Sequence, residues 1–288
     1  MRFLKQFISA RNFKFILLIL LILPLIMPAQ IPNDKAIDLY KFNYKWEVPL
    51  TATMFVGSYF GFDKLKHKDH LDLNTINNLR PDNVWFLDRC AVKQNPCFRL
   101  NAQDISDWGL NISIILPGIL ALDKKVRHEW LDLLFIYLET QALTNTLYSW
   151  GSTQWTRRIR PLVYYKEVSI EEKTGSGTTD SFYSGHVSNT AAASFFMAKV
   201  YCDFHPELGK KKWILYGAAI IPPAFVGIMR YKALKHFPTD IFVGTLIGAG
   251  LGILIPKLHK IKKQKNISFL PMVGNFTGLR LSYQVKYK

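Results

Sequence analysis

Long apolar stretches separated by short basic links constrain this chain more than any other feature of its sequence. Five stretches have the length and composition of membrane helices: 108–122, 130–150, 186–201, 213–229 and 241–256. A helix needs about 20 mostly apolar residues to cross a bilayer, and helices satisfy their own backbone hydrogen bonds there. The sequence therefore predicts an all-α integral membrane helical bundle and not two soluble domains.

The N-terminal segment 1–29 adds a further apolar stretch. Basic residues within positions 1–14 precede an unbroken apolar run that ends at Ala29. This pattern is typical of a secretory signal peptide, and an uncleaved N-terminal anchor has the same pattern. Both interpretations send the chain to a bacterial-type export route. Together with the other stretches, the bundle is expected to hold about six helices.

The shorter apolar segment 49–62 is compatible with two arrangements. It follows Glu47, contains Pro49 and Gly57, and is too short to span a bilayer comfortably. We expect a helix packed along the membrane or part-way into it. If the N-terminus stays inside, the same segment is instead the first true span.

Positive charge is concentrated in alternate links between the apolar stretches. The chain has 37 basic and 21 acidic residues, for a formal net charge of +16. The links 123–128 and 202–212 and the tail after 256 are rich in basic residues, and the positive-inside rule places them together on the cytoplasmic face. Anionic lipids are the expected partners of this charge. No nucleic-acid motif accompanies it, so nucleic acid is not an expected partner.

This topology places the other links on the opposite face, which is the periplasmic face of a bacterial inner membrane. Ser184, Gly185 and His186 are in one of these links, after the Gly/Ser/Thr-rich loop 173–181. They begin an apolar, helix-like run. A helix N-terminus favours anions, because its first N–H groups lack partners and its dipole is positive there.

Two arginines and a second histidine have comparable positions just outside apolar stretches. Arg160, Arg230 and His236 all fall on the same predicted face. Arginine forks match phosphate oxygens, and imidazole exchanges protons near neutral pH. The sequence therefore predicts an outward-facing phosphate pocket that carries two histidines.

Three short motifs resemble those of the type 2 phosphatidic acid phosphatases, a family that shares a superfamily with vanadium haloperoxidases and bacterial nonspecific acid phosphatases. The family motifs are K-x6-R-P, P-S-G-H and S-R-x5-H-x3-D. The corresponding residues here are Thr153-x6-Arg160-Pro161, Tyr183-Ser184-Gly185-His186 and Met229-Arg230-x5-His236-x3-Asp240. Order and spacing agree, and the resemblance covers roughly residues 107–258.

The chain departs from the family pattern at three positions. Thr153 replaces a lysine, Tyr183 replaces a proline and Met229 replaces a serine. The first change removes a cation from the phosphate site. Arg158 or Arg157 could supply that charge, although neither has the matching position.

The resemblance implies a role for each site residue and requires no metal ion or other cofactor. His236 is expected to form a phosphohistidine, His186 to protonate the leaving oxygen, and Asp240 to hold the His236 tautomer. Residues expected to bind the substrate phosphate are Arg160, Ser184, Gly185, Arg230 and the replacement cation Arg158.

The function that follows is a metal-independent membrane phosphatase acting on a phosphomonoester or pyrophosphate of an envelope lipid. Candidate substrates, by resemblance, are lipid A, undecaprenyl pyrophosphate, phosphatidylglycerol phosphate and phosphatidic acid. A non-catalytic lipid-phosphate binding or transport protein is the alternative that Thr153 favours. A vanadate-dependent haloperoxidase is a third interpretation, because the same kind of pocket binds vanadate.

The chain divides into four regions. These are a signal peptide or anchor at 1–29, a short amphipathic helix with an extracytoplasmic loop at 30–106, a phosphatase helical core at 107–258, and a basic tail with a small β-hairpin at 259–288. Alternating apolar residues from 279 to 287 predict the hairpin. The loop 62–106 is a candidate lid or substrate selector. Within it, Cys90 and Cys97 could pair in an oxidising compartment.

Overall fold

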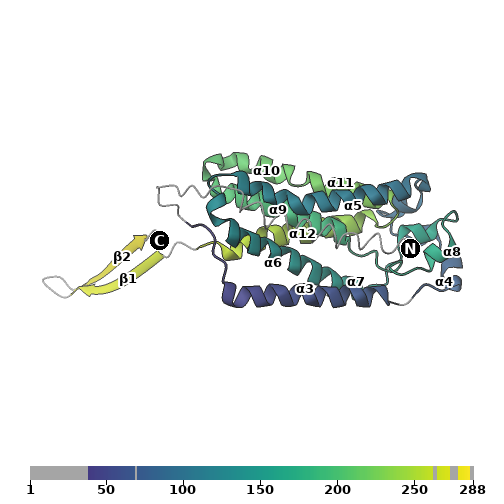
Figure 1. Cartoon of the computed structure of the whole chain (residues 1–288), viewed down its shortest axis with the longest axis horizontal. Helices are drawn as coiled ribbons and strands as arrows, with labels where there is room; N and C mark the ends of the chain where they lie inside the picture. The colour runs from purple at the N-terminus through teal and green to yellow at the C-terminus, as the bar shows by residue number, and fades with distance from the viewer. Residues whose placement is uncertain (1–37, 69, 262–264, 273–277, 286–288) are drawn as a thin grey trace.

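The computed structural model describes residues 38–68, 70–261, 265–272 and 278–285. The predicted signal peptide or anchor at 1–29 lies outside these residues. The fold is a bundle of long helices that lie side by side along one axis (Figure 1). These helices are α3 (Tyr44–Lys66), α5 (Arg99–Ile115), α6 (Trp130–Trp150), α9 (Gly185–Phe204), α10 (Lys212–Ala218), α11 (Ile221–Lys232) and α12 (Pro238–His259).

Short helices form the connections. The α-helical ones are α4 (Leu73–Asn77), α7 (Ser152–Trp155) and α8 (Ile170–Lys173), and the 3₁₀ helices are η1 (Pro81–Asn83), η2 (Arg89–Val92), η3 (Pro96–Phe98), η4 (Leu116–Leu122), η5 (Arg127–Glu129), η6 (Pro161–Tyr164) and η7 (Pro206–Lys211). Figure 1 shows α4 and α8 together at one end of the bundle.

Three helical stretches among the described residues are long and apolar enough to cross a bilayer: Pro96–Leu122, Pro206–Lys232 and Pro238–His259. Their large apolar side chains remain exposed outside the protein core, as at Trp108, Ile112 and Phe242. In water such a surface would aggregate, whereas in a bilayer it faces lipid. The chain is therefore a helical membrane protein, and the count of about six crossings stays a prediction.

Helix α9 lies at the centre of the bundle, and α12 packs closely against it. At Gly244, an added Cβ would lie 2.7 Å from the Ser184 carbonyl oxygen, and at Gly252 it would lie 2.5 Å from that of Ala192. Neither position has room for a side chain. The four-residue glycine spacing of this helix thus serves close helix packing, as expected of small-residue stripes in membranes.

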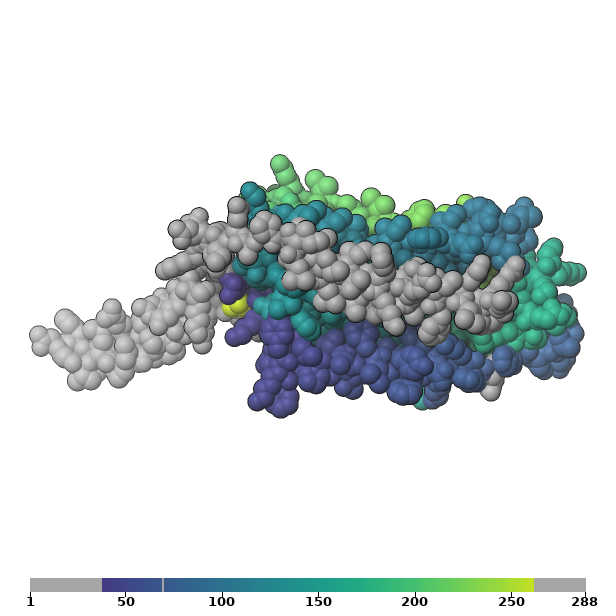
Figure 2. Space-filling view, in the orientation of Figure 1, coloured from purple at the N-terminus to yellow at the C-terminus, as the bar shows by residue number. Residues whose placement is uncertain are grey.

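Helix α3 corrects the expectation of a short element at 49–62. It has 23 residues, which makes it about 35 Å long at 1.5 Å per residue. Pro49 is the sixth residue of this helix and does not end it. The helix runs along α6, where Trp150 Nε1 donates to the Gly57 carbonyl at 2.7 Å. It forms one long edge of the molecule (Figure 2, purple).

Two predicted segments also have different bounds. The stretch predicted as one helix over 213–229 is divided into α10 and α11, and Pro222 and Pro223 occupy the first turn of α11. Proline lacks an N–H and is tolerated there. Helix α5 starts at Arg99, well before the predicted residue 108, and continues past Pro117 as the 3₁₀ helix η4.

Strands β1 (Lys265–Met272) and β2 (Gly278–Val285) pair antiparallel, with Lys265 opposite Val285 and Met272 opposite Gly278. The residues 273–277 that connect them lie outside the described residues. The C-terminal β-hairpin therefore stays a prediction.

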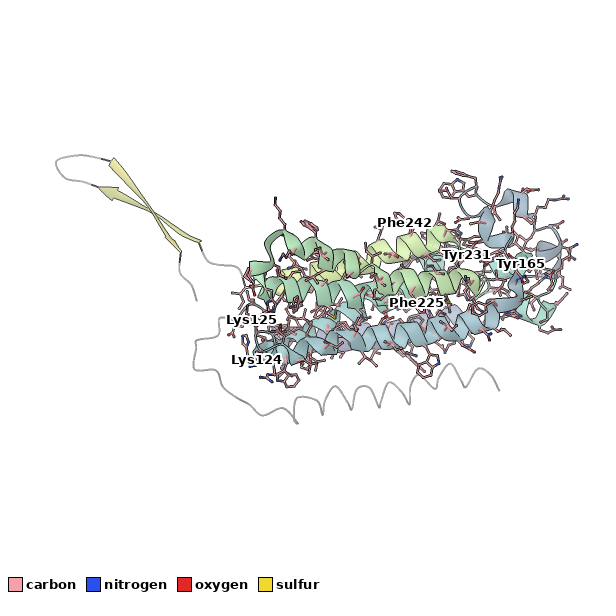
Figure 3. All side chains as sticks on the ribbon, turned by 90° about the horizontal axis from the view of Figure 1, so that it is seen from above. Lys124, Lys125, Tyr165, Phe225, Tyr231 and Phe242 are labelled. Carbon is pink, nitrogen blue, oxygen red and sulfur yellow. The ribbon has the colours of Figure 1, made fainter. Side chains whose placement is uncertain are left out.

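The two ends of the bundle differ in their residues. Lys124 and Lys125 lie at one end, and Tyr165 and Tyr231 lie at the other (Figure 3). Lys125 Nζ contacts Glu207 Oε1 at 2.6 Å, so the basic links 123–128 and 202–212 adjoin each other. The motif-bearing loops gather at the opposite end, which we call the site end.

Candidate functional site

His236 occupies the short connection between α11 and α12. Its side chain is buried, and Nδ1 lies 2.7 Å from the Ser181 carbonyl oxygen. A carbonyl oxygen only accepts hydrogen bonds, so Nδ1 carries the proton and Nε2 keeps a lone pair. The main chain of Ser181 thus selects the tautomer in which Nε2 can act as a nucleophile.

The charges around His236 keep its ring neutral. Burial, followed by the nearby charges of Arg230 and Arg160, lowers the pKa of His236 well below its ordinary value. A protonated ring would be desolvated and repelled by both guanidinium groups. His236 is therefore neutral near pH 7, and the two arginines predicted to bind phosphate lie close to it.

His186 stands in the first turn of α9 and pairs with an acidic residue from α5. Its Nε2 lies 2.9 Å from Asp107 Oδ1, and the same oxygen accepts a hydrogen bond from Arg230 Nη1 at 3.4 Å. This carboxylate favours the protonated imidazole, whereas burial and the charge of Arg230 disfavour it more strongly. No sequence pattern indicated Asp107, because it immediately precedes the apolar stretch and belongs to no motif.

Among the buried side-chain donors without partners at the site end, three come from arginines and a serine that the sequence predicted to bind phosphate. Arg160 Nε, Arg230 Nε and Ser184 Oγ have no hydrogen-bond partner among the described residues. Buried donors are nearly always paired, and an unpaired one is costly. All three belong to the predicted phosphate-binding set, and they are available for ligand oxygens.

Gly185 has a different neighbour from the one expected. A Cβ at this position would lie 2.9 Å from the Tyr148 ring, so the missing side chain makes room for that tyrosine. The backbone of Gly185 still begins helix α9, directly after the N-cap residue Ser184. Its N–H therefore belongs to the turn whose donors lack intrahelical partners.

Asp240 does not hold the His236 ring in the way predicted. Its carboxylate accepts hydrogen bonds from Ser181 Oγ at 2.6 Å, from the Phe237 N–H at 2.9 Å and from Arg158 Nη1 at 2.5 Å. Ser181 therefore connects the two groups, since its hydroxyl donates to Asp240 and its carbonyl accepts from His236. Asp240 positions the loop that positions the histidine.

Arg158, predicted as the replacement phosphate ligand, contacts acidic side chains in this structure. Its guanidinium is shared between two carboxylates, with Nη1 on Asp240 and Nη2 on Asp88 Oδ2, each at 2.5 Å. Asp88 also accepts from Thr239 Oγ1 at 2.7 Å and from the Thr239 N–H at 3.1 Å. Arg158 thus links the loop 62–106 to the start of α12.

A lysine from outside the motifs reaches the position where the family lysine is missing. Lys68 Nζ donates to the carbonyl oxygens of Thr153 and Thr156, both at 2.7 Å, and contacts Asp180 Oδ1 at 3.0 Å. Its side chain is only 12% exposed. Lys68 lies 85 residues before Thr153, so no local sequence pattern could have identified it.

Lys235 adds another cation next to His236. Burial, followed by the charges of Arg160 and Arg230, lowers the pKa of Lys235 to about 7. Glu172 acts in the opposite direction, although Arg99 holds its carboxylate in two hydrogen bonds of 2.6 and 2.8 Å. Lys235 is consequently a cation whose charge changes near physiological pH.

The two cysteines of the loop 62–106 are not paired. Cys90 and Cys97 are both free and exposed. The disulfide that the sequence left open is absent from the structure of these residues.

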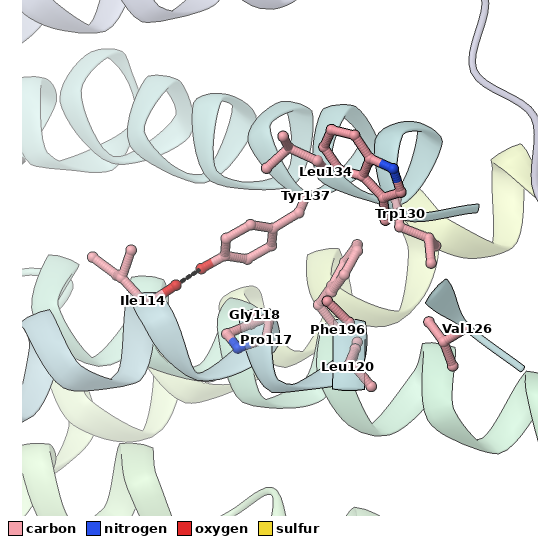
Figure 4. A pocket seen from close by; sticks show the side chains of 11 residues that line it. Ile114, Pro117, Gly118, Leu120, Val126, Trp130, Leu134, Tyr137 and Phe196 are labelled. Carbon is pink, nitrogen blue, oxygen red and sulfur yellow. Dashed lines mark hydrogen bonds between the residues drawn. The ribbon is translucent and has the colours of Figure 1, made fainter. Parts of the chain in front are cut away.

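A separate pocket opens between α6, α9 and η4 (Figure 4), and neither site histidine lines it. Apolar side chains line it, including Trp130, Leu133 and Phe196. Tyr137 contributes a hydroxyl, which donates to the Ile114 carbonyl at 2.7 Å. Its apolar lining does not suit a phosphate group, so the chemistry is assigned to the site end.

Residues 129–264 match the sequence profile of the PAP2 superfamily. Among solved structures, the chain is similar to the first transmembrane PAP2-type phosphatidylglycerolphosphate phosphatase from Bacillus subtilis. That similarity has 21% sequence identity and a TM-score of 0.41, and it covers 75% of this chain and 96% of the other. No curated protein matches the chain. The profile includes both site histidines, whereas Asp88 and Asp107 precede it.

Proposed function

Because the chain belongs to the PAP2 superfamily, we propose that it is a metal-independent membrane lipid-phosphate phosphatase. Its substrate is a phosphomonoester or pyrophosphate of an envelope lipid. The candidates are lipid A, undecaprenyl pyrophosphate, phosphatidylglycerol phosphate and phosphatidic acid. Their shared chemistry is an anionic phosphate at the membrane surface, joined to an apolar chain within it.

The observation that carries this proposal is the set of unpartnered donors around a neutral histidine. Arg160 Nε, Arg230 Nε and Ser184 Oγ are buried and lack partners among the described residues. A phosphate monoester has several acceptor oxygens and a charge of about −1.5 to −2 near neutral pH. Its oxygens would satisfy these donors, and the arginine charges would offset its own.

In the first chemical step, His236 Nε2 attacks phosphorus. A P–N bond forms while the P–O bond to the lipid breaks, and His186 delivers its proton to the leaving oxygen. Water then attacks the phosphohistidine and gives a proton back to His186, which releases inorganic phosphate. Asp107 orients the His186 ring through the contact at 2.9 Å, and its carboxylate stabilises the protonated ring that forms in the second step.

Lys68 compensates for the threonine at the family's lysine position. Its ammonium group donates three hydrogen bonds, to the carbonyl oxygens of Thr153 and Thr156 and to the Asp180 carboxylate. We therefore propose that Lys68 is a positioning residue and not a phosphate ligand. By neutralising Asp180, it keeps that carboxylate from repelling the substrate. The backbone carbonyl of Asp180 lies 3.4 Å from Arg160 Nη2, so the effect reaches the phosphate site.

The proposal includes the predicted topology and regions. The site end faces the periplasm of a bacterial inner membrane, and the basic links at the opposite end face the cytoplasm. Residues 107–258 form the phosphatase core, after a signal peptide or anchor at 1–29 and the segment 30–106. Residues 259–288 form the basic tail and the β-hairpin.

Phosphate release by the full-length protein in detergent tests this function across the four candidate lipids. The assay contains EDTA, and His236→Ala is compared with His67→Ala, a matched change at an exposed loop histidine. We expect metal-independent release from one lipid, lost in His236→Ala and kept in His67→Ala.

Two outcomes would contradict the proposal. If the folded wild type released phosphate from none of the four lipids, the result would favour the non-catalytic lipid-phosphate binding protein that Thr153 suggests. Vanadate-dependent oxidation of halide by the same preparation would favour the haloperoxidase.

A further inference from the structure

The loop that follows η1 presents three consecutive apolar side chains to the outside. Trp85, Phe86 and Leu87 are 55%, 66% and 49% exposed. The two aromatic rings contact each other edge to face, with centroids 5.2 Å apart. We call these three residues the apolar tip. A contiguous apolar surface of this kind marks a contact with another molecule or with a membrane.

The tip is fixed at the membrane-facing side of the site end. Val84, Ala91 and Val92, which flank it, form a buried cluster with Phe237, and Tyr231 packs against that cluster. Tyr231 belongs to the stretch Pro206–Lys232, and Phe237 immediately precedes Pro238–His259, both of which can cross a bilayer. The tip therefore lies beside the ends of two membrane helices.

The surroundings match the chemistry of a bilayer interface. Phe242 (Figure 3) lies one turn into α12, just after Phe237 of the buried cluster, and is 63% exposed, so lipid-facing surface begins near the start of this helix. Arg89 follows the tip and is held by the carbonyl oxygens of Val84 at 2.9 Å and Asp82 at 3.0 Å. Aromatic side chains with adjacent basic residues are typical of the headgroup region of anionic membranes.

The residue after the tip connects it to the catalytic groups. Asp88 is fully buried and binds Arg158 and Thr239. Arg158 binds Asp240, and Ser181 joins Asp240 to His236. The path from the tip to the nucleophile therefore consists of buried, charge-assisted hydrogen bonds, which hold a fixed geometry better than solvated ones.

We propose that Trp85, Phe86 and Leu87 insert into the headgroup region of an anionic phospholipid bilayer. Asp88 fixes the position of this inserted tip relative to the phosphate site. The proposal rests on the lipid-phosphatase function and deepens it. Insertion fixes the depth of His236 along the membrane normal relative to the lipid phosphates. A substrate embedded in the bilayer requires the tip, whereas a small water-soluble phosphate ester does not.

The first test compares two substrates with the full-length protein in vesicles of phosphatidylcholine and phosphatidic acid. For Trp85→Ser/Phe86→Ser/Leu87→Ser, we expect hydrolysis of phosphatidic acid to fall about tenfold, while hydrolysis of para-nitrophenyl phosphate changes by less than about twofold. Trp213→Ser, which removes another exposed tryptophan from α10, should change neither rate. An equal loss on both substrates, or no loss on either, would overturn the proposal.

A second measurement does not depend on turnover. Trp85 fluorescence, obtained as the difference between wild type and Trp85→Phe, should be quenched when brominated phosphatidylcholine replaces the ordinary lipid. An unquenched Trp85 would place the tip in water or against another protein and would overturn the proposal. If the wild type hydrolysed neither substrate, the other candidate lipids would test the phosphatase function, and this quenching would still decide whether the tip enters the bilayer.

Discussion

At the end of the bundle opposite the site, Asp203 accepts a hydrogen bond from the Tyr40 hydroxyl at 2.5 Å and contacts Lys260 Nζ at 2.8 Å. It also pairs with Lys199. At the site end, by contrast, Arg160 and Arg230 each keep an Nε without a partner among the described residues. Both ends bury charged groups, and the two arginines with an unpartnered Nε among the described residues both lie at the site end.

This difference separates structural charges from binding charges. A buried carboxylate surrounded by cations and a hydroxyl is satisfied, and it holds the chain in place. A buried donor without an acceptor destabilises the protein on its own, so its persistence indicates a ligand. The same residue types thus serve stability at one end and recognition at the other.

The largest effect that would sharpen this comparison is expected at Asp203. Asp203→Asn leaves Lys199 and Lys260 without their carboxylate, and breaking a buried pair costs about 3 kcal/mol. The unfolding midpoint in detergent should therefore fall, while the folded fraction keeps its turnover. His236→Asn should do the reverse and lose turnover without a change in midpoint. An Asp203→Asn protein with an unchanged unfolding midpoint and no turnover would contradict the distinction between structural and binding charges.

A smaller effect is expected at Lys68, which belongs to the site end although its hydrogen bonds are satisfied. Lys68→Met should lower kcat/KM about tenfold, mainly through KM, because an unpaired Asp180 then repels the phosphate. Adding Asp180→Asn should restore part of that loss, since it removes the repelling charge. Lys64→Met, at an exposed lysine on α3, is the matched control. Equal behaviour of the two lysine variants would remove Lys68 from the site.

The smallest effect concerns pH. Because the pKa of Lys235 is lowered to about 7, this side chain loses its proton as the pH rises through 7, and the site loses one positive charge. His236 stays neutral throughout, since its pKa is lowered well below the ordinary value. Competitive inhibition by sulfate, whose charge is constant, should therefore weaken about threefold between pH 7 and 9.

Lys235→Met provides the control for this pH dependence. The variant should bind sulfate more weakly at pH 7 and show a nearly flat inhibition constant up to pH 9. A pH dependence that persists in Lys235→Met would assign it to another group facing the pocket.

The sequence predicted the elements that rest on local patterns. Helix α6 runs over Trp130–Trp150, as its apolar stretch indicated. The motif residues Arg160, Ser184, Arg230 and His236 all lie at the same end of the bundle, although their assigned roles stay predictions. The apolar pattern was sufficient to predict their common location, because each motif adjoins the end of a strongly apolar segment.

The residues that support the site could not be predicted, because each acts across a long separation in the chain. Asp88 lies 70 residues before Arg158, and Asp107 lies 79 residues before His186. A single carboxylate in a polar loop gives no sign of which cation it will meet. The assignment of Arg158 to phosphate stays a prediction; its proximity to the motif was visible in the sequence, whereas its two acidic partners were not.

The nucleophile is oriented by a main-chain atom. The acceptor of the His236 Nδ1 proton is the carbonyl of Ser181, and every amino acid that could replace Ser181 carries the same carbonyl. Genetic variation therefore cannot delete this contact by exchanging one side chain, as it could if a carboxylate oriented the ring. What variation can change is the course of the backbone, which the Ser181 hydroxyl secures through Asp240. Selection on the histidine's orientation is thus expected to act on the shape of this loop more than on the chemical identity of its residues.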